Sequence, residues 1–155
     1  RLQLPLLVLR ARRELSRRIP DIAVCAGMAD TLRRLHEAGA TLGILTTNSR
    51  ANVHRFLESH RLTGVFDVVR TRRDPFGKAR ALRGLIRSLD RIAAPPVYVG
   101  DEGRDVRAGK AAGARTVAVT WGLSGPQALA RERPDALVST AEQLMSAVDA
   151  LTANR

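Results

Sequence analysis

The chain has 155 residues, of which 45% are hydrophobic, so we expect one globular domain and no extensive disorder. No apolar run approaches the roughly 20 residues that cross a bilayer, and a single cysteine excludes an internal disulfide. We therefore expect a cytoplasmic protein without a membrane partner. The formal net charge of +11 suggests nucleic-acid binding, but the arginines are scattered and aromatic residues make up only 3%. We expect no nucleic-acid partner.

The first part of the chain predicts helices. Residues 1–18 combine a short apolar run with a basic tail, which indicates an amphipathic helix that Pro20 ends. A second helix follows, because Leu32 and Leu35 recur at helical spacing before Gly39.

Beyond residue 40, strand patterns alternate with helical patterns. Short apolar runs predict strands over residues 41–46, 65–70, 96–100, 115–120 and 136–138. Helical spacing predicts helices over residues 51–60, 78–89, 106–112, 126–131 and 141–151. This alternation predicts βαβ units in an α/β fold with a parallel sheet. Ligands bind beyond the carboxyl ends of the strands in such a sheet, so we expect the functional residues there.

Two carboxylates follow the strand predicted over residues 96–100. Gly100 allows the backbone to turn sharply, and Asp101 and Asp105 come directly after it. Carboxylates at a strand end suit Mg²⁺, which prefers oxygen ligands. The alternative is that Asp101 caps the following helix and Asp105 is a solvated acid in its first turn. Spacing alone leaves both interpretations open.

Phosphate binding is indicated at two further places. The stretch LGILTTNS, residues 42–49, brings hydroxyls and amides to a strand end that enters a helix, where backbone N–H groups favour an anion. Thr46 would add a hydroxyl donor, whereas an ordinary helix cap by Asn48 or Ser49 is the alternative. Lys78 is one of two lysines and stands where a helix dipole disfavours a cation, so an anionic ligand would explain it. The other, Lys110, is expected to be exposed.

The order of these features resembles motifs two, three and four of the haloacid dehalogenase superfamily: a threonine-ended strand, a lysine before a helix, and a strand closing in Gly-Asp-x-x-x-Asp. The stretches GDEGRDVRAGKAAGA, VAVTWG and ERPDALVSTAEQL are similar to those of its phosphoglycolate-phosphatase-like members. The resemblance implies a Rossmann-like core over residues 21–155 and a remnant of a helical cap over residues 1–20. It also implies a Mg²⁺-dependent phosphoric monoester hydrolase that acts on a small phosphorylated metabolite through an aspartyl-phosphate.

The resemblance assigns a role to each matching residue. Thr46 would hydrogen-bond the transferring phosphoryl group, and Lys78 would neutralise its charge. Asp101 would ligate Mg²⁺, and Asp105 would support the metal site and orient Lys78 or a metal-bound water. The implied residues are Lys78, Thr46 and Asp105 for catalysis, Thr46, Thr47, Asn48 and Lys78 for phosphate, and Asp101 and Asp105 for the metal.

The family's nucleophile motif, an Asp-x-Asp at the end of the first central strand, has no counterpart here. Asp21 and Asp30 stand in the wrong context, before or within helices. The resemblance thus implies that the central strand between those ending at Thr46 and Gly100 is missing, and that this chain is inactive by itself. Its neighbours would expose unpaired backbone groups unless the strand comes in trans or they close up. The alternative function is a catalytically inactive module that binds a phosphorylated ligand or a protein partner.

Other polar residues give weaker signals. Arg50 and Trp121 stand near predicted strand ends and could border a pocket, but a surface arginine and a packed indole are commoner. His36, His54 and His60 are expected on the surface, because their spacing does not suit a metal. We expect a monomer or a homodimer.

Overall fold

The computed structural model describes residues 18–71, 77–89 and 94–153. The helix predicted over residues 1–18, and with it most of the predicted cap remnant, lies outside the described residues. In chain order the elements are η1 (Ile19–Asp21), α2 (Met28–Glu37), β1 (Gly43–Thr46), α3 (Arg50–Ser59), β2 (Val68–Thr71), α4 (Lys78–Arg87), β3 (Val97–Gly100), α5 (Gly103–Ala112), β4 (Arg115–Val119), α6 (Pro126–Arg131), β5 (Ala136–Val138) and α7 (Ala141–Ala153). No helix in these ranges is long and apolar enough to span a membrane.

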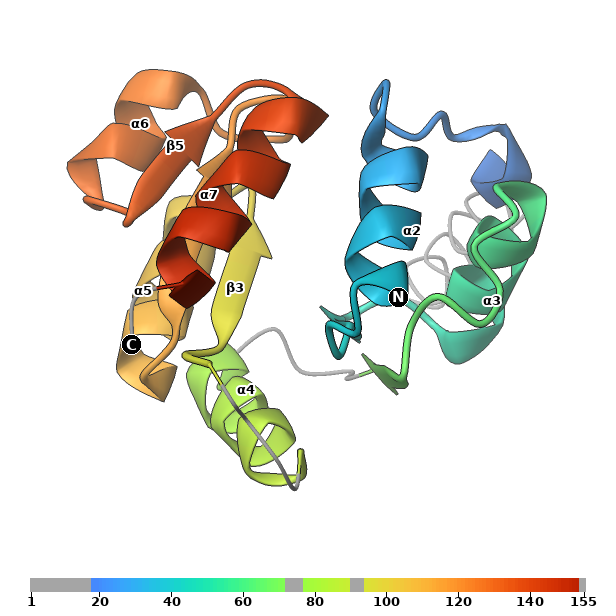
Figure 1. Cartoon of the computed structure of the whole chain (residues 1–155), viewed down its shortest axis with the longest axis horizontal. Coiled ribbons are helices and arrows are strands. Elements are labelled where there is room, and N and C mark those ends of the chain that lie inside the picture. Colours follow the sequence, from blue (N-terminus) through green and yellow to red (C-terminus); the bar gives the residue numbers. More distant parts are fainter. Residues whose placement is uncertain (1–17, 72–76, 90–93, 154–155) are drawn as a thin grey trace, which may run out of the picture.

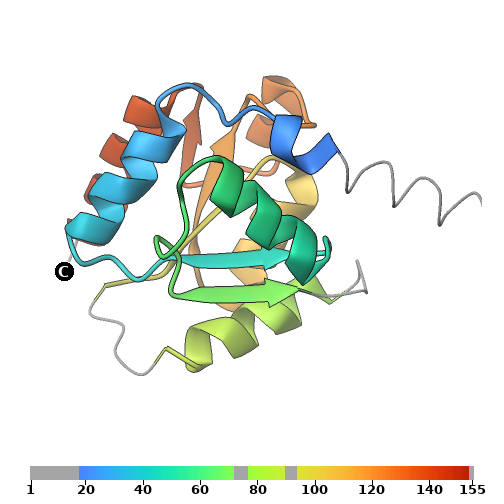
Figure 2. The same cartoon turned by 90° about the vertical axis from the view of Figure 1, so that its right-hand side faces the viewer.

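The strands form two parallel sheets, one of β1 and β2 and one in the order β3-β4-β5. Gly43 pairs with Val68 in the first sheet, and Val97 pairs with Arg115 in the second. The predicted parallel α/β fold is confirmed, and the described residues contain no strand between β1 and β3, where the sequence predicts a missing central strand. Figure 2 shows the strands of the two sheets running in different directions. The neighbours of the missing strand have therefore not closed up to pair.

The three-stranded sheet is covered by helices on both faces. Successive side chains of a strand point to opposite faces, so β4 contributes to two apolar clusters. Val117 and Val119 pack with Leu144 of α7, whereas Ala118 packs with Val106 of α5. Figure 1 shows α7 and α5 on either side of this sheet. The sheet that ends beside Asp101 therefore has a core of its own.

The two-stranded sheet is covered by α3. Val53 and Leu57 of this helix are buried against Ile44 of β1 and Val69 of β2. Contacts between helices join this part to the rest of the chain, because α2 packs against α7 (Figure 1). On the other side, α4 packs against α5, and Leu85 of α4 lies beside Gly43 of β1. The two sheets are thus held together by helices and not by a shared ladder of backbone hydrogen bonds.

Two predicted boundaries were wrong by three residues, and the others differ by two or fewer. The strand predicted from Val65 begins at Val68, because Val65 N–H donates to the Leu62 carbonyl in a turn. The helix predicted from residue 106 begins at Gly103, because the Asp105 carboxylate accepts a hydrogen bond from the backbone N–H of Glu102. Both differences come from local hydrogen bonds that hydrophobic spacing does not report.

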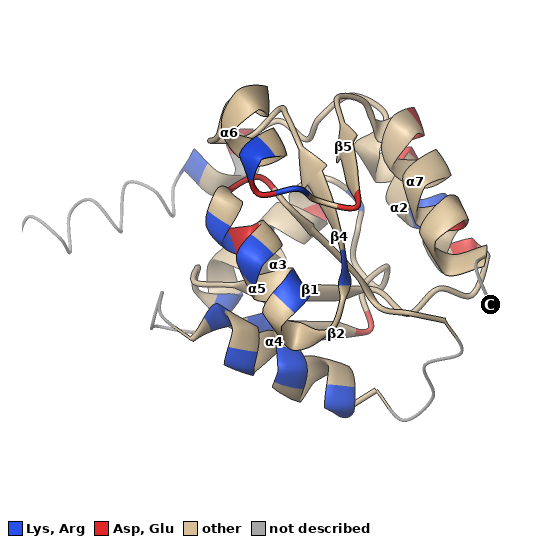
Figure 3. Cartoon of the chain, turned by 90° about the vertical axis from the view of Figure 1, so that its left-hand side faces the viewer, with Lys and Arg blue, Asp and Glu red and all other residues tan. Residues whose placement is uncertain are grey.

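Basic side chains are spread over several helices, as Figure 3 shows for α3, α4 and α5. Some are paired: Arg107 forms an ion pair with Glu132, and Arg115 with Asp135 at 3.1 Å. Exposed pairs of this kind contribute little to stability. The expectation that this charge does not mark a nucleic-acid partner remains a prediction.

We predict low stability for this chain, because no strand among the described residues covers the free edges of β1 and β3. Urea unfolding should give a free energy below about 5 kcal/mol, the lower end of the usual range. Trp121 is the only tryptophan and packs on the three-stranded sheet, so its fluorescence reports that part. Its transition should not coincide with the loss of far-ultraviolet circular dichroism. A single coincident transition of ordinary stability would contradict this.

Candidate functional site

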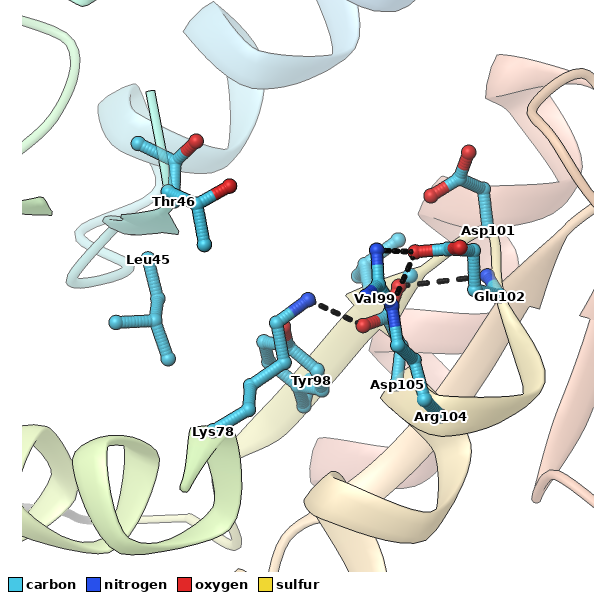
Figure 4. Close-up of a pocket in the computed structure, with 11 residues that line it drawn as sticks. Leu45, Thr46, Lys78, Tyr98, Val99, Asp101, Glu102, Arg104 and Asp105 are labelled. Carbon is cyan, nitrogen blue, oxygen red and sulfur yellow. Dashed lines mark hydrogen bonds and ion pairs between the residues drawn. The ribbon is translucent and has the colours of Figure 1, made fainter. Parts of the chain in front are cut away.

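A pocket of ≈ 280 Å³ lies where the carboxyl ends of β1 and β3 meet the start of α4 and the loop before α5 (Figure 4). This is the edge at which a parallel sheet is expected to hold a ligand. Most of the residues predicted from the sequence line it, and Asn48 does not. The lining residues are Leu45, Thr46, Thr47, Lys78, Tyr98, Val99, Gly100, Asp101, Glu102, Arg104 and Asp105.

Two glycines allow the backbone and the carboxylates to approach closely. A Cβ at Gly100 would lie 2.7 Å from Oδ2 of Asp105 and 2.8 Å from its carboxyl carbon. A Cβ at Gly122 would lie 2.5 Å from the carboxyl carbon of Asp101. Side chains do not tolerate such distances, so each carboxylate keeps its place only beside a glycine.

Lys78 and Asp105 form an ion pair at the base of the pocket. Lys78 begins α4, and its Nζ donates to Oδ1 of Asp105, whose side chain is only 5% exposed. Burial lowers the pKa of Lys78, but the hydrogen bond to Asp105 and the influence of the neighbouring Tyr98 raise it, and the net pKa lies above its ordinary value of 10.5. The lysine is therefore an ammonium at neutral pH. Asp105 needs this partner, because an unpaired buried carboxylate is strongly disfavoured.

The backbone and side chain of Asp101 are tied to the loop after β4. Its Oδ2 accepts a hydrogen bond from Leu123 N–H at 2.8 Å, and its carbonyl accepts one from Ser124 N–H at 3.1 Å. The residue that caps α5 is Glu102, so the interpretation of Asp101 as the helix cap was wrong. Asp105 does stabilise the first turn of α5, but it is buried there and not solvated.

The carboxylates of Asp101, Glu102 and Asp105 could hold a metal ion, since each offers an oxygen within 4.8 Å of the others. Both oxygens of Asp105 are already bonded, to Lys78 and to the backbone of Glu102. Within the described ranges, Oδ1 of Asp101 has no hydrogen-bond partner. A hard cation such as Mg²⁺ prefers oxygens of this kind and binds through one or two carboxylates. The donor set therefore fits Mg²⁺, with Asp101 as its first ligand.

Hydrogen bonds between residues close in sequence order the β1 side of the pocket. Oγ1 of Thr46 accepts from Asn48 N–H at 3.1 Å, which leaves its own hydroxyl proton to donate. The side-chain oxygen of Asn48 accepts from Ser49 N–H and from the Asn52 amide. Ser49 caps α3 by accepting from Asn52 N–H at 3.2 Å. The capping interpretation is thus confirmed for Ser49, and Asn48 orders the loop.

Sequence reasoning missed three polar residues at this site, Tyr98, Glu102 and Arg104. Tyr98 stands in an apolar strand and gave no signal, although it lines the pocket beside Lys78. Glu102 follows Asp101 directly and could have been noticed as a third carboxylate; it forms an ion pair with Arg104 at 2.5 Å. Burial raises the pKa of Tyr98, and the charge of Asp105 raises it further, while Lys78 lowers it.

The remaining polar residues lie outside the pocket. Arg50 is exposed at the start of α3, and Trp121 packs against the cluster around Val119, so the structure favours a surface arginine and a packed indole. His36 and His54 are exposed. His60 is half-buried directly after α3, with Nε2 2.7 Å from the carbonyl of Ile22.

Comparison with known proteins identifies the family. Residues 4–119 match the model of the haloacid dehalogenase-like hydrolases. A phosphoglycolate phosphatase from Synechococcus elongatus is 39% identical over 145 residues, which cover 94% of this chain and 68% of that protein. The chain belongs to the haloacid dehalogenase-like hydrolase family. Another relative, a pyrophosphatase PpaX from Bacillus pumilus, is 33% identical over 78% of this chain and 57% of its own length.

Solved structures agree with this family assignment at the level of the fold. A haloacid dehalogenase family hydrolase from Deinococcus radiodurans, solved with bound phosphate and sodium, has a TM-score of 0.73 at 21% identity. The alignment covers 86% of this chain and 62% of that one. A predicted phosphoglycolate phosphatase from Haemophilus somnus has a TM-score of 0.72 at 18% identity over 81% of this chain and 57% of its own. Apart from the Synechococcus protein, the chain spans about three fifths of these relatives or less.

We predict that Gly100→Ala destabilises the folded chain by about 1–3 kcal/mol, because the new Cβ overlaps Asp105. Gly84→Ala is the matched control, since Gly84 lies in α4 with nothing within 4 Å of a built Cβ. That variant should gain about 0.5–1 kcal/mol through helix propensity. Urea midpoints of the two variants and the parent protein measure both effects. Equal midpoints for the two variants would show that Asp105 does not depend on this glycine.

We predict that the phenol of Tyr98 ionises above its ordinary pKa of 10.0, since burial and Asp105 both raise it. Tyr98 is the only tyrosine, so the near-ultraviolet absorbance of phenolate titrates this one group. The folded pKa exceeds the unfolded one, so the stability linked to this proton is complete below the unfolded value and is lost as the pH rises through the folded value. Lys78→Met should raise the Tyr98 pKa further. A midpoint at or below 10.0 in the folded chain would refute the assignment.

Proposed function

We propose that this chain carries the phosphate- and Mg²⁺-binding residues of a phosphatase that hydrolyses small phosphoric monoesters. The observation that carries the proposal is the convergence of Thr46, Lys78 and Asp101, from three separate elements, on one pocket. The names of the Synechococcus and Bacillus relatives, a phosphoglycolate phosphatase and a pyrophosphatase, support the same class of reaction. The fold alone would not, because one fold serves many chemistries.

Each residue of the pocket has a part in binding a phosphoryl group. The hydroxyl of Thr46 can donate to a phosphoryl oxygen, because its oxygen accepts from Asn48 N–H and its proton is left to donate. The Lys78 ammonium places a positive charge in the same pocket, which favours the charge that develops during transfer. Asp101, with Asp105 behind it, would hold Mg²⁺, which when bound neutralises phosphoryl oxygens and orients the substrate.

We propose that the chain does not form an aspartyl-phosphate by itself. Among the described residues, the carboxylates that line the pocket are Asp101, Glu102 and Asp105, all at the corner between β3 and α5. Lys78 and the backbone already occupy Asp105, and Leu123 N–H binds Asp101. Glu102 pairs with Arg104, and the remaining oxygen of Asp101 would bind Mg²⁺, so none of the three is left to attack phosphorus as the nucleophile of a covalent mechanism.

The same observation supports a second function, an inactive module that binds a phosphorylated ligand or a protein partner. Binding needs the hydroxyl, the ammonium and the cation site, whereas turnover also needs an attacking group. The two functions therefore predict the same affinity for phosphate and different rates of hydrolysis.

Other features of the protein remain proposals as well. We propose a division into a cap remnant over residues 1–20 and a catalytic core over residues 21–155. With the single Cys25 and no other sulfhydryl to pair with it, we place the protein in the cytoplasm, as a monomer or homodimer without a nucleic-acid partner.

The test joins this chain to the part of the Synechococcus relative that it does not match and assays an aryl phosphate with Mg²⁺. The chimera should hydrolyse it, and the chain alone should not. Asp101→Asn should lower turnover by about 100-fold or more, because it removes a charge that serves the transition state. Asp149→Asn, an exposed carboxylate on α7, is the matched control and should leave turnover unchanged.

The outcomes separate the two functions. A chimera without turnover that still binds phosphate and Mg²⁺ favours the inactive module. Undiminished turnover of the Asp101→Asn chimera would exclude Asp101 as the metal ligand. Turnover by the chain alone would overturn the proposal that it lacks a nucleophile.

A further inference from the structure

The loop that joins β4 to α6 lies directly against Asp101. The Leu123 N–H donates to Oδ2 of Asp101 at 2.8 Å, and the Ser124 N–H donates to its carbonyl at 3.1 Å. Gly122 lies so close that a Cβ built on it would be 2.5 Å from the carboxyl carbon of Asp101. Three consecutive residues of this loop therefore hold both the backbone and the side chain of Asp101.

Both ends of this loop are anchored in the core. At one end the Thr120 N–H donates to the Val138 carbonyl of β5 at 3.0 Å, and Trp121 packs with the apolar cluster between β4 and α7. At the other end Gly125 precedes α6, whose Leu129 is fully buried against α5. Because the loop is fixed at both ends, its N–H groups are already in place before any ligand arrives.

The side chain of Leu123 does not explain this arrangement. It is 82% exposed, whereas the N–H of the same residue is directed at the Asp101 carboxylate. A leucine stabilises a fold through the apolar area that it buries, and this one buries little. The contribution of Leu123 at this point is therefore that of its backbone.

The contacts of the loop distinguish the two oxygens of the Asp101 carboxylate. Oδ2 accepts the Leu123 N–H, whereas Oδ1 has no hydrogen-bond partner within the described part of the chain. A carboxylate that rotated freely would present either oxygen, or both, to a cation. Gly122 and the Leu123 N–H limit that rotation, so Oδ1 alone is presented as a ligand. Figure 4 shows this carboxylate apart from the ion pair of Lys78 and Asp105.

We propose that Gly122 and Leu123 are positioning residues for the cation, because they hold the Asp101 carboxylate so that Oδ1 alone binds Mg²⁺. Groups that orient a metal ligand typically change the metal affinity by about 10- to 100-fold. This inference rests on the proposed function, since it assumes that Mg²⁺ binds Asp101. Linkage is reciprocal, so a bound cation also favours the hydrogen bond from Leu123 by the same factor.

Two glycines of the same loop provide a matched pair of variants. Gly122→Ala places a methyl group against the Asp101 carboxylate, whereas a Cβ at Gly125 meets nothing within 4 Å. Mn²⁺ is the probe, because it binds the same oxygen ligands as Mg²⁺ and its unpaired electrons broaden the NMR signals of nearby amides. The quantity to be measured is the Mn²⁺ concentration that halves the height of the Asp101 amide signal.

Gly122→Ala should require about tenfold more Mn²⁺ than the parent protein, because the displaced carboxylate no longer directs Oδ1 at the cation. Gly125→Ala should require the same concentration as the parent. A purely structural role of Gly122 would lower the urea midpoint and leave the Mn²⁺ requirement of the folded protein unchanged. Asp101→Asn completes the set and should abolish the broadening.

Other results separate this inference from the proposed function. If Gly122→Ala and Gly125→Ala need equal Mn²⁺ while Asp101→Asn binds none, the loop does not position the carboxylate and the proposed function stands. If the parent protein does not bind Mn²⁺, or Asp101→Asn binds it equally well, the cation site of the proposed function fails and this inference with it.

A measurement on the parent protein covers a Gly122→Ala variant that does not fold. Hydrogen exchange of the Leu123 N–H should slow by about tenfold when Mg²⁺ is added, since the two effects are linked. The Thr120 N–H, which donates to Val138 at the anchored end, is the internal reference and should not change. Faster exchange at Leu123 would show that the cation takes both oxygens and displaces the N–H. Unchanged exchange while Mg²⁺ shifts the Asp101 amide signal would show that the loop and the cation are not coupled, and either result overturns the inference.

Discussion

The ion pair between Lys78 and Asp105 is the interaction on which the rest of the site depends. A carboxylate as buried as that of Asp105 is tolerated only when charge and hydrogen bonds compensate it. Lys78 supplies the charge and so fixes the start of α4 against α5. Because Gly100 has no side chain, α5 can lie against β3 with Asp105 beneath the loop that carries Asp101. Such a pair specifies an arrangement more than it stabilises one.

The sequence was a good guide to the elements and a poorer one to their ends. Apolar runs and helical spacing placed every described strand and helix beyond residue 40, and the break between β1 and β3 falls where the sequence predicts a missing strand. The starts of β2 and α5 were misplaced because they depend on single hydrogen bonds at Leu62 and Asp105. Periodicity reports which face is buried, and it does not report such bonds.

The residues of the site likewise include some that the sequence predicts and some that it does not. The order of Thr46, Lys78 and Asp101 could be predicted because chemistry at strand ends follows from topology. Tyr98 could not, since a tyrosine in an apolar strand has the pattern of a core residue, although this one lines the pocket. Asn48 was predicted to bind phosphate because amides suit it, but its side-chain oxygen accepts hydrogen bonds from Ser49 N–H and the Asn52 amide. A local backbone donor thus competes with the ligand for this side chain.

The division into two sheets also has a thermodynamic consequence. Thr46 stands on one sheet, whereas Asp101 stands on the other, with Lys78 on the helix beside it. An anion that contacts both sides would act as a tether between them, so its binding free energy and the association free energy of the two parts are linked. Linkage is reciprocal: anything that tightens the packing of α2 on α7, far from the pocket, would also tighten anion binding. Affinity in this molecule is thus a property of the whole assembly of helices as much as of the residues that touch the ligand.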